Sequence, residues 1–439
     1  MKSFKSLFKY IFPESLLLQY HHFEALVTAF AYGFPSRKLV IIGVTGTKGK
    51  TTTANFIWTC LQAGGYKTGL IGTANIRIGE NESLNPYHMT MPGPRVIQKF
   101  LAQMVKEGCT HVIVETTSEG IKQWRHAGIW YDVAVFTNLT PEHLQAHGGS
   151  FNAYREAKGM LFKSLMQHPA KIFLGKKVDR AILVNNDSSE KTYFFAFPAD
   201  KKMTFGKKEH ADWMAKNIQA TETETSFDIN EETYLLKILG EFNVVNALPA
   251  IAIASQFSIP PEKIRQGLRE LTLIPGRMEK IDEGQPYTVL VDYAHEKESM
   301  TAVLNTAKTI VPPGAHILVL LGAEGGGRDK VKRPIMGTIA AEKADVVIVS
   351  NVDPYEDDPQ EILEDIAIAA EMGGKIRDKN LFVIADRREG IQKALLEAKE
   401  HDIVLITGKG AEQSIVIDGI RSPWDDRDVV REELKKLKK

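Results

Sequence analysis

The stretch VIIGVTGTKGKTTTANFIW, residues 40–58, limits the possible folds more than any other part of the chain. Its first residues are apolar and β-branched, its middle holds glycines and lysines, and its last part has apolar residues at helical spacing. This order predicts a strand, a loop and a helix. Because free backbone N–H groups and a helix N-terminus attract anions, we expect the loop to bind phosphate.

The loop matches the general P-loop pattern G-x-x-x-x-G-K-[ST] only in its second half. Gly49, Lys50 and Thr51 fit that half, in which the lysine reaches the β- and γ-phosphates and the hydroxyl binds Mg²⁺. Val44 stands where the pattern has its first glycine. A flexible turn before a helix is the alternative, but it does not explain the order of glycine, lysine and threonine. The loop therefore favours a nucleotide with Mg²⁺ as its ligands.

Strand-like and helix-like segments alternate along the rest of the chain. THVIVETTS and YDVAVFTNLT read as strands whose apolar runs suit a buried parallel sheet. A second series begins near Gly276, and its apolar strands end in polar or glycine-rich residues. The sequence predicts an α/β fold with a short helical N-terminal segment (1–39), a central P-loop-type ATPase domain with a mostly parallel sheet (40–276) and a C-terminal Rossmann-like α/β domain (277–439).

Composition excludes several classes of protein. The chain has 439 residues, more than the ~250–300 that one hydrophobic core usually supports. Its 55 basic residues balance 55 acidic ones, so no basic excess indicates a nucleic-acid partner. With only two cysteines, neither a disulfide framework nor a zinc cluster is expected. We expect a cytoplasmic protein, and a monomer.

The N-terminal residues are apolar and aromatic but do not predict a membrane span. The longest uncharged run there, residues 25–36, is shorter than the ~18–20 residues that a span needs. One or two amphipathic helices that pack on the next domain are the preferred interpretation. Contact with a membrane surface is the lesser alternative, suggested by lysines beside apolar residues, namely Lys2, Lys5 and Lys9 beside Phe4, Phe8 and Ile11.

The segment TGTKGKTT, residues 45–52, resembles the nucleotide loop T-G-T-N-G-K-T-T of the Mur ligase family, with Lys48 in place of the asparagine. Other segments resemble that family's motifs in the same order. They are VETTS (114–118), FTNLTPEHLQAHG (136–148), YREAKGMLF (154–162), LGEFNVVNALPA (239–250), PGRME (275–279), VDYAH (291–295), GRDKVKRPIMG (327–337) and GKGAE (408–412). The likeness is greatest to the branch that adds the third residue of the peptidoglycan stem peptide.

The resemblance implies roles for particular residues. Lys50, Glu115, His143 and Lys158 would be catalytic, and Thr51, Glu115, His143 and Lys158 would hold or support Mg²⁺, with Lys158 carbamylated. ATP would be bound by Gly46, Thr47, Lys48, Gly49, Lys50, Thr51, Thr52, Asn243, Asn246, Arg277 and Asp292. The acceptor would be bound by Thr90, Thr117, Gln123 and Arg125, and the amino acid by Arg328, Asp353, Tyr355, Gly408 and Glu412. Taken singly, each residue also has a plain structural explanation, such as helix capping for Asn243.

Two departures from the family pattern concern the substrates. Ligases of this family that use UDP-linked substrates carry an N-terminal domain before the loop, where this chain has about forty residues, so a changed or lipid-linked acceptor is considered. Diaminopimelate-adding members have a D-N-P-R motif whose arginine binds the distal carboxylate. Here Val352-Asp353-Pro354-Tyr355 stands there, and tyrosine cannot form the bidentate bonds of arginine. This favours a lysine-like diamine as the amino acid.

The resemblance implies an ATP-dependent amide ligase that adds an amino acid to a peptidoglycan stem-peptide precursor through an acyl phosphate, giving ADP and phosphate. Its partners would be small molecules: a UDP-N-acetylmuramoyl dipeptide or related precursor, and an amino acid. Alternatives are glutamate addition like that of folylpolyglutamate synthase, modification of a lipid-linked precursor, and an ATP-binding subunit without catalysis. A transporter-type ATPase is disfavoured because no partner-signature motif is found in the sequence.

Overall fold

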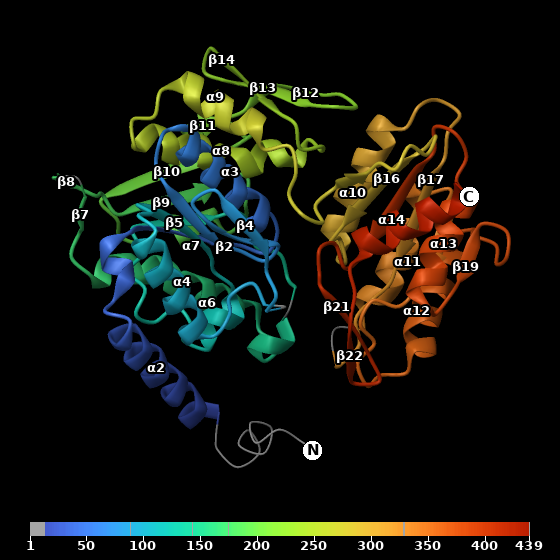
Figure 1. The fold of residues 1–439 in the computed structure, drawn as a ribbon, viewed down its shortest axis with the longest axis horizontal. Coiled ribbons are helices and arrows are strands. Elements are labelled where there is room, and N and C mark those ends of the chain that lie inside the picture. Colours follow the sequence, from blue (N-terminus) through green and yellow to red (C-terminus); the bar gives the residue numbers. More distant parts are fainter. Residues whose placement is uncertain (1–13, 88, 143, 174, 328–329, 439) are drawn as a thin grey trace. The chain divides into compact units, whose positions relative to one another are not determined.

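The computed structural model describes residues 14–87, 89–142, 144–173, 175–327 and 330–438. Two expected site residues, His143 and Arg328, lie outside this described part. By its internal contacts the chain forms two compact units, which divide after Leu271, and residues 218–226 and 235–243 group with the second unit. The domain boundary expected at residues 276 and 277 stays a prediction. The elements of each unit are labelled in Figure 1.

A nine-stranded sheet forms the centre of the first unit, in the order β11-β10-β9-β6-β1-β5-β2-β3-β4. Pairings from β11 through to β2 are parallel, whereas β2-β3 and β3-β4 are antiparallel. The strands are β1 (Val40–Thr45), β2 (Thr68–Ile71), β3 (Asn75–Ile78), β4 (Asn81–Leu84), β5 (His111–Glu115), β6 (Val133–Phe136), β9 (Ala181–Asn185), β10 (Lys201–Gly206) and β11 (Trp213–Met214). The predicted mostly parallel sheet is confirmed.

Helices cover this sheet because its central strands are apolar on both faces. One core joins side chains of β1, β5 and β6 to those of α4 (Pro94–Lys106) and α6 (Phe151–Ser164). Helix α3 (Lys50–Ala63) packs on β1, β2, β5 and α9 (Pro261–Glu270). The remaining helices of this part are α5 (Ser118–Lys122), α7 (Lys191–Phe195) and α8 (Phe242–Gln256), with 3₁₀ turns η2 (Leu144–His147) and η3 (Leu165–Gln167).

The N-terminal segment is helical, as predicted, over its described residues. Helix α2 (Glu14–Ala31) contacts α4, and the 3₁₀ turn η1 (Pro35–Lys38) leads into β1. Small additional sheets are β7 (Ile172–Phe173) with β8 (Lys176–Lys177), and β12 (Lys216–Ala220) with β13 (Thr225–Ile229) and β14 (Glu232–Leu236). None of the helices in the described part is long and apolar enough to cross a membrane.

The second unit is a doubly wound six-stranded sheet in the order β15-β16-β20-β17-β18-β19, antiparallel only at the β15 edge. Its strands are β15 (Glu279–Ile281), β16 (Thr288–Asp292), β17 (Ile317–Leu321), β18 (Val346–Val349), β19 (Leu381–Val383) and β20 (Ile403–Thr407). Its helices are α10 (Lys297–Ile310), α11 (Lys332–Lys343), α12 (Pro359–Met372), α13 (Arg387–Glu397) and α14 (Asp426–Leu437), and a hairpin joins β21 (Ser414–Ile417) to β22 (Ile420–Pro423). This is the Rossmann-like architecture that the sequence predicts.

Successive residues of these strands enter two different cores. On β17, Val319 and Leu321 pack with α10, α11 and α12, whereas Leu318 and Leu320 pack with α13 and α14. This follows from the period of two in a strand, which sends neighbouring side chains to opposite faces. Both faces are therefore covered, and the polar residues that follow the strands collect at the carboxyl edge of the sheet.

Candidate active site

The glycine loop joins β1 to α3, as the sequence predicts, and two of its glycines cannot be replaced without displacement. Gly46 has a φ of 152°, and a Cβ there would lie 1.9 Å from the Thr137 hydroxyl oxygen. Gly49, the N-cap of α3, has a left-handed φ of 80°, and a Cβ there would lie 2.2 Å from Asn246 Oδ1. Glycine at these two positions thus lets the loop backbone lie close to Thr137 and Asn246.

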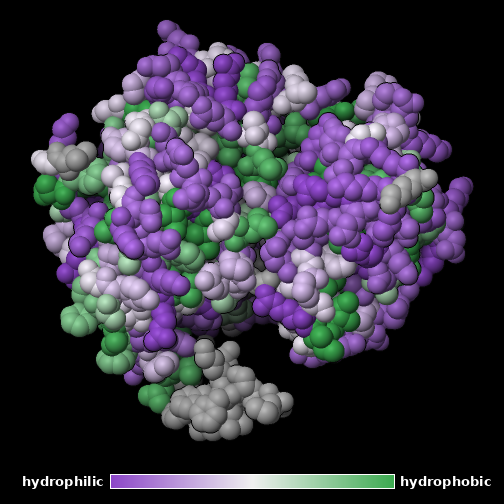
Figure 2. Space-filling model, viewed as in Figure 1, coloured by the Kyte–Doolittle hydropathy of each residue, from purple (hydrophilic) through white to green (hydrophobic). Residues whose placement is uncertain are grey.

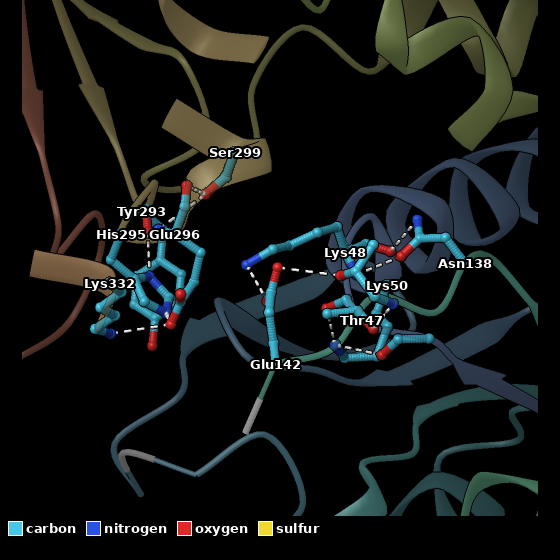
Figure 3. A network of polar contacts seen from close by, with 12 residues as sticks. Thr47, Lys48, Lys50, Asn138, Glu142, Tyr293, His295, Glu296, Ser299 and Lys332 are labelled. Carbon is cyan, nitrogen blue, oxygen red and sulfur yellow. Dashed lines mark hydrogen bonds and ion pairs between the residues drawn. The ribbon is translucent and has the colours of Figure 1, made fainter. Parts of the chain in front are cut away.

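The segment that follows β6 holds the loop in place. Asn138 accepts a hydrogen bond from the Lys48 backbone N–H at 2.8 Å and donates one to the Lys48 carbonyl at 3.2 Å. Lys48 Nζ lies 2.6 Å from Glu142 Oε2, and Figure 3 shows these two side chains pointing toward one another. The Thr47 hydroxyl accepts from the Thr140 N–H at 3.0 Å. Lys48, which stands where the family has asparagine, therefore forms an ion pair with Glu142 in the segment that follows β6.

Lys50 lies against the loop whose phosphate-binding role it is expected to share. Its Nζ donates to the carbonyl oxygens of Gly46 at 3.0 Å and Thr47 at 2.9 Å (Figure 3). The next two residues, Thr51 and Thr52, are buried in the first turn of α3. Cation, helix N-terminus and loop backbone thus meet at one place, which is the arrangement that binds polyphosphate.

Glu115, at the carboxyl end of β5, contacts this first turn. It is fully buried, and its carboxylate accepts hydrogen bonds from the Thr51 hydroxyl at 3.1 Å and from the N–H and hydroxyl of Thr73 at 2.9 and 2.8 Å. A hydroxyl and a carboxylate this close are oxygen ligands of the kind that Mg²⁺ takes together with substrate phosphates. Thr51 and Glu115 therefore fit Mg²⁺, although no cluster of three or more His, Cys, Asp or Glu side chains suited to a metal occurs among the described residues.

Lys158, on α6, is a buried lysine with an unusual environment. It is 2% exposed, its Nζ donates to the Gly46 carbonyl at 2.9 Å and lies 4.5 Å from the Tyr154 ring centre, and no described carboxylate forms a salt bridge with it. Burial and the nearby Lys50 cation lower its pKa well below the usual value. The neutral amine is thereby favoured at the loop.

Two of the four expected acceptor residues, Gln123 and Arg125, contact one another. The Arg125 guanidinium donates to the Met91 carbonyl and, through Nε and Nη2, to Gln123 Oε1. The Thr90 hydroxyl lies 2.9 Å from that of Thr73, which in turn donates to Glu115. The fourth residue, Thr117, is the N-cap of α5 and accepts from the Gly120 N–H. Thr117 therefore caps a helix in this structure.

A stack of rings connects the acceptor segment to helix α2. The ring centres of His22 and Trp124 lie 4.1 Å apart, with an angle of 23° between the rings, and those of Trp124 and His126 lie 5.7 Å apart. Trp124 has a left-handed φ of 57° and stands between Gln123 and Arg125. Burial, with the nearby His22, lowers the pKa of His126 to about 4, so its ring is neutral at pH 7.

In the second unit, Arg277 and Asp292 lie beside Tyr293. The Arg277 guanidinium stacks 4.6 Å from the Tyr293 ring centre. Asp292 accepts from the N–H groups of Met278 and Ala294, each at 2.7 Å. Burial raises the pKa of Asp292, and the Arg277 cation opposes that shift. Two expected nucleotide residues of this unit thus stand at one strand end, while the third, Asn243, donates to the Leu239 carbonyl.

Lys409 is the centre of the expected amino-acid site. It is fully buried, and its Nζ lies 2.8 Å from both Asp353 Oδ2 and Glu412 Oε2. Burial alone would lower its pKa, but these two carboxylates outweigh burial and raise it. Glu412 also accepts from the Tyr293 hydroxyl at 3.1 Å, and its charge raises the pKa of that tyrosine well above the usual value. This site therefore pairs one buried cation with two carboxylates.

Two other expected residues line the same strand ends. Gly408 follows β20 with a left-handed φ of 112°, and a Cβ there would lie 2.8 Å from Val352 Cγ2. Tyr355, also left-handed, places its ring beside Gly326 of the glycine run after β17. Figure 3 further shows Lys332 directed at Glu296, 2.9 Å away, in a group with Tyr293 and His295.

Two family models match most of this chain. The model of the Mur ligase middle domain matches residues 44–254, and that of the Mur ligase glutamate ligase domain matches residues 276–410. The UDP-N-acetylmuramoyl-L-alanyl-D-glutamate–2,6-diaminopimelate ligase of Geobacillus kaustophilus is 38% identical over 416 residues, covering 92% of this chain and 80% of the relative. The chain belongs to the Mur ligase family.

Other members agree in sequence and in fold. The UDP-N-acetylmuramyl-tripeptide synthetase of a Roseiflexus species is 36% identical to this Mur ligase, covering 94% of it and 81% of the relative. A solved diaminopimelate ligase has 30% identity and a TM-score of 0.60, covering 91% of this chain and 79% of that one. Folylpolyglutamate synthase of Mycobacterium tuberculosis has a TM-score of 0.67 over 97% of both chains, but at 17% identity it shows the fold alone.

These matches confirm the predicted activity, an ATP-dependent ligase that adds an amino acid to a peptidoglycan precursor. Sequence reasoning nevertheless missed several supporting residues of this Mur ligase. Thr73, which holds Glu115, stands in a turn with no motif around it. Lys409 lies inside the GKGAE segment, which was considered only for Gly408 and Glu412. A lysine between two expected ligand positions was the signal that could have identified it.

Proposed function

We propose that this ligase joins a diamino acid with a cationic side-chain end, such as L-lysine, to UDP-N-acetylmuramoyl-L-alanyl-D-glutamate, the acceptor in the relatives' names. The main support for this proposal is the arrangement of four side chains around one glycine loop, namely Lys50, Thr51, Glu115 and Lys158. ATP would phosphorylate the acceptor carboxylate, and the amine of the amino acid would then displace phosphate from the acyl phosphate. The setting expected for this reaction is the cytoplasm, and the expected state a monomer.

The residues around the loop have separate tasks in this proposal. The loop N–H groups and Lys50 bind and orient the ATP phosphates, and Thr51 and Glu115 would hold Mg²⁺. When bound, that ion supplies positive charge that stabilises the transferring phosphoryl group. Thr73 keeps the Glu115 carboxylate oriented through two hydrogen bonds. Since phosphoryl transfer depends mainly on position and charge, this chain's part in that step is binding and orientation.

Lys158 is proposed to work as a carbamate. Its lowered pKa makes the neutral amine available at neutral pH, and that amine can add to CO₂, which forms a carbamate and releases one proton. The modification would convert a buried neutral amine next to Lys50 into an anion that pairs with it. His143, expected to act with it, lies outside the described residues.

Charge in the second unit supports an amino acid with a cationic end. Lys409 offsets only one of its two carboxylate neighbours, Asp353 and Glu412, so the three ionised groups together carry one negative charge. An ammonium group would be attracted there, and Tyr355 offers no second cation for a distal carboxylate. The names of several relatives specify 2,6-diaminopimelate, so this choice is the point on which the chain would differ from them.

Phosphate release tests the proposal directly. Protein with Mg-ATP and UDP-N-acetylmuramoyl-L-alanyl-D-glutamate would be given L-lysine, L-ornithine or meso-diaminopimelate, and product mass would be measured. Release that needs both the acceptor and L-lysine is expected. Release with diaminopimelate alone would reject the choice of amino acid. If ATP binds but no amino acid gives product, the assay is repeated with a lipid-linked acceptor. Absence of product with that acceptor as well would favour an ATP-binding subunit without catalysis.

A further inference from the structure

Helix α2 exposes large apolar side chains to an extent that surface helices normally avoid. Phe30 is 74% exposed, Phe23 66% and Tyr20 60%. Leu16, Leu26 and Val27 are exposed as well. Figure 1 shows where α2 lies on the first unit, and hydrophobic side chains are visible over it in Figure 2. An exposed apolar patch of this kind marks an interaction site.

The spacing places these side chains on one side of the helix. Residues 16, 20, 23, 27 and 30 recur at steps of four and three, which keeps them in line along a helix with 3.6 residues per turn. The opposite side carries the small residues Ala25 and Ala29, both fully buried, and a Cβ on Gly128 would lie 2.6 Å from that of Ala29. Helix α2 is therefore fixed to the domain by its small residues and directs its large ones outward.

Basic residues stand on both sides of this helix in the sequence. Arg37 and Lys38, in the turn η1 after α2, are exposed. Before it, residues 1–13 include Lys2, Lys5 and Lys9 and have no acidic residue. Within the exposed apolar stripe itself no residue is charged. An apolar, aromatic-rich stripe with cationic neighbours is complementary to a bilayer with anionic headgroups, where aromatic rings lie at the interface and lysines meet the phosphates.

We propose that α2 docks this ligase onto an anionic lipid surface. A second copy of the chain is the main competitor, because steps of four and three also describe a coiled-coil seam. A seam, however, is narrow and flanked by charged residues, whereas here Leu26 widens the stripe and Glu24 is the one charged neighbour among residues 15–31. Basic flanks would also repel their copies in a parallel pair but attract anionic lipid. The surface therefore suits a bilayer better.

Sedimentation with vesicles tests the docking on the full chain. Vesicles of phosphatidylcholine with one part in three phosphatidylglycerol are compared with pure phosphatidylcholine vesicles. We expect binding to the anionic vesicles that falls about tenfold or more in the double variant Phe23→Ser/Phe30→Ser and about tenfold when Arg37 and Lys38 become Gln. The control, Ile368→Ser/Met372→Ser, changes two exposed apolar residues of α12 and should bind like the native chain.

Two results would overturn the proposal. One is equal binding by the native chain and the Phe23→Ser/Phe30→Ser variant, or no binding by either. The other is a dimer in sedimentation equilibrium that this variant dissociates, which would assign the stripe to a second copy. Phosphate release by the variants in free solution shows that they are folded. Because that activity is measured without vesicles, a failure of docking is distinct from a failure of the ligase assignment.

Discussion

Each of the two units has a buried lysine, and the two lysines differ in their hydrogen-bond and ion-pair partners. In the first unit, Lys158 donates to a backbone carbonyl and has no described carboxylate partner within salt-bridge distance. In the second unit, Lys409 is bonded to Asp353 and Glu412, each at 2.8 Å. Both lysines are at most 2% exposed, so their environments, and not their burial, separate them.

This difference predicts opposite roles. A buried lysine without an anionic partner destabilises a fold, because it must give up its proton on folding, so its presence indicates a function that outweighs the cost. A lysine between two carboxylates, in contrast, is required to keep those carboxylates from being buried without a partner. Changes at the first site should therefore affect turnover without loss of stability, and changes at the second should affect stability first.

The largest effect is expected for Lys158→Met. The side chain keeps its length but can neither form a carbamate nor donate a hydrogen bond, so kcat for phosphate release should fall about a thousandfold. ATP binding, measured by calorimetry, should remain. The free energy of unfolding should stay equal or rise, because the cost of deprotonating a buried lysine on folding is removed. If the variant lost stability and kept its kcat, Lys158 would have a structural role, contrary to the role in turnover proposed for it.

The next largest effect is expected for Lys409→Met. Asp353 and Glu412 would remain buried without their shared cation, and the free energy of unfolding should fall by ~3–5 kcal/mol. Thermal unfolding followed by circular dichroism measures this loss. The matched variant Lys409→Met/Asp353→Asn/Glu412→Gln removes all three charges and should regain much of the stability. An unchanged melting temperature in the single variant would show that Lys409 serves only the substrate.

A pH dependence sharpens the same comparison. The pKa of Lys158 is lowered in the folded chain but is ~10.4 in the unfolded chain. Between these values the unfolded chain binds a proton that the folded chain lacks, so the native chain's stability rises with pH, by at most ~1.4 kcal/mol per unit.

Lys158→Met lacks this contribution, so its advantage over the native chain should shrink as pH rises from 7 toward 10. Urea unfolding of both chains in CO₂-free buffer checks it, because every other titrating group is common to the two. Stability curves that run parallel across this range would contradict a lowered pKa for Lys158.

Local patterns in the sequence predict helices and strands well, but they predict contacts between residues far apart in the sequence poorly. The strand, loop and helix of residues 40–58 follow from β-branching, glycine and helical spacing, which act over a few residues. The bonds from Thr73 to Glu115 join positions 42 residues apart, and Thr73 stands in the connection between β2 and β3, which no pattern indicated. For α2, a helix was predicted, but which of its faces is buried depends on residues far away in the sequence, such as Gly128, where a Cβ would lie 2.6 Å from that of Ala29.

The smallest expected effect concerns the stack of His22 on Trp124. Trp124 stands between the acceptor residues Gln123 and Arg125, so His22→Ala should loosen their segment and raise the KM for the acceptor about fivefold, equivalent to ~1 kcal/mol for one ring pair. The KM for ATP should not change, because Asn138 and Thr140, which follow β6, hold the glycine loop.

His22→Phe retains a flat ring and should restore the acceptor KM, whereas the control Gln19→Ala changes an exposed residue of the same helix and should leave it unaltered. If both KM values rose together in His22→Ala, the stack would serve the stability of the whole unit. A selective effect would instead show that a helix outside the nucleotide loop helps to set acceptor binding, so that this unit separates the positioning of its two substrates between different elements.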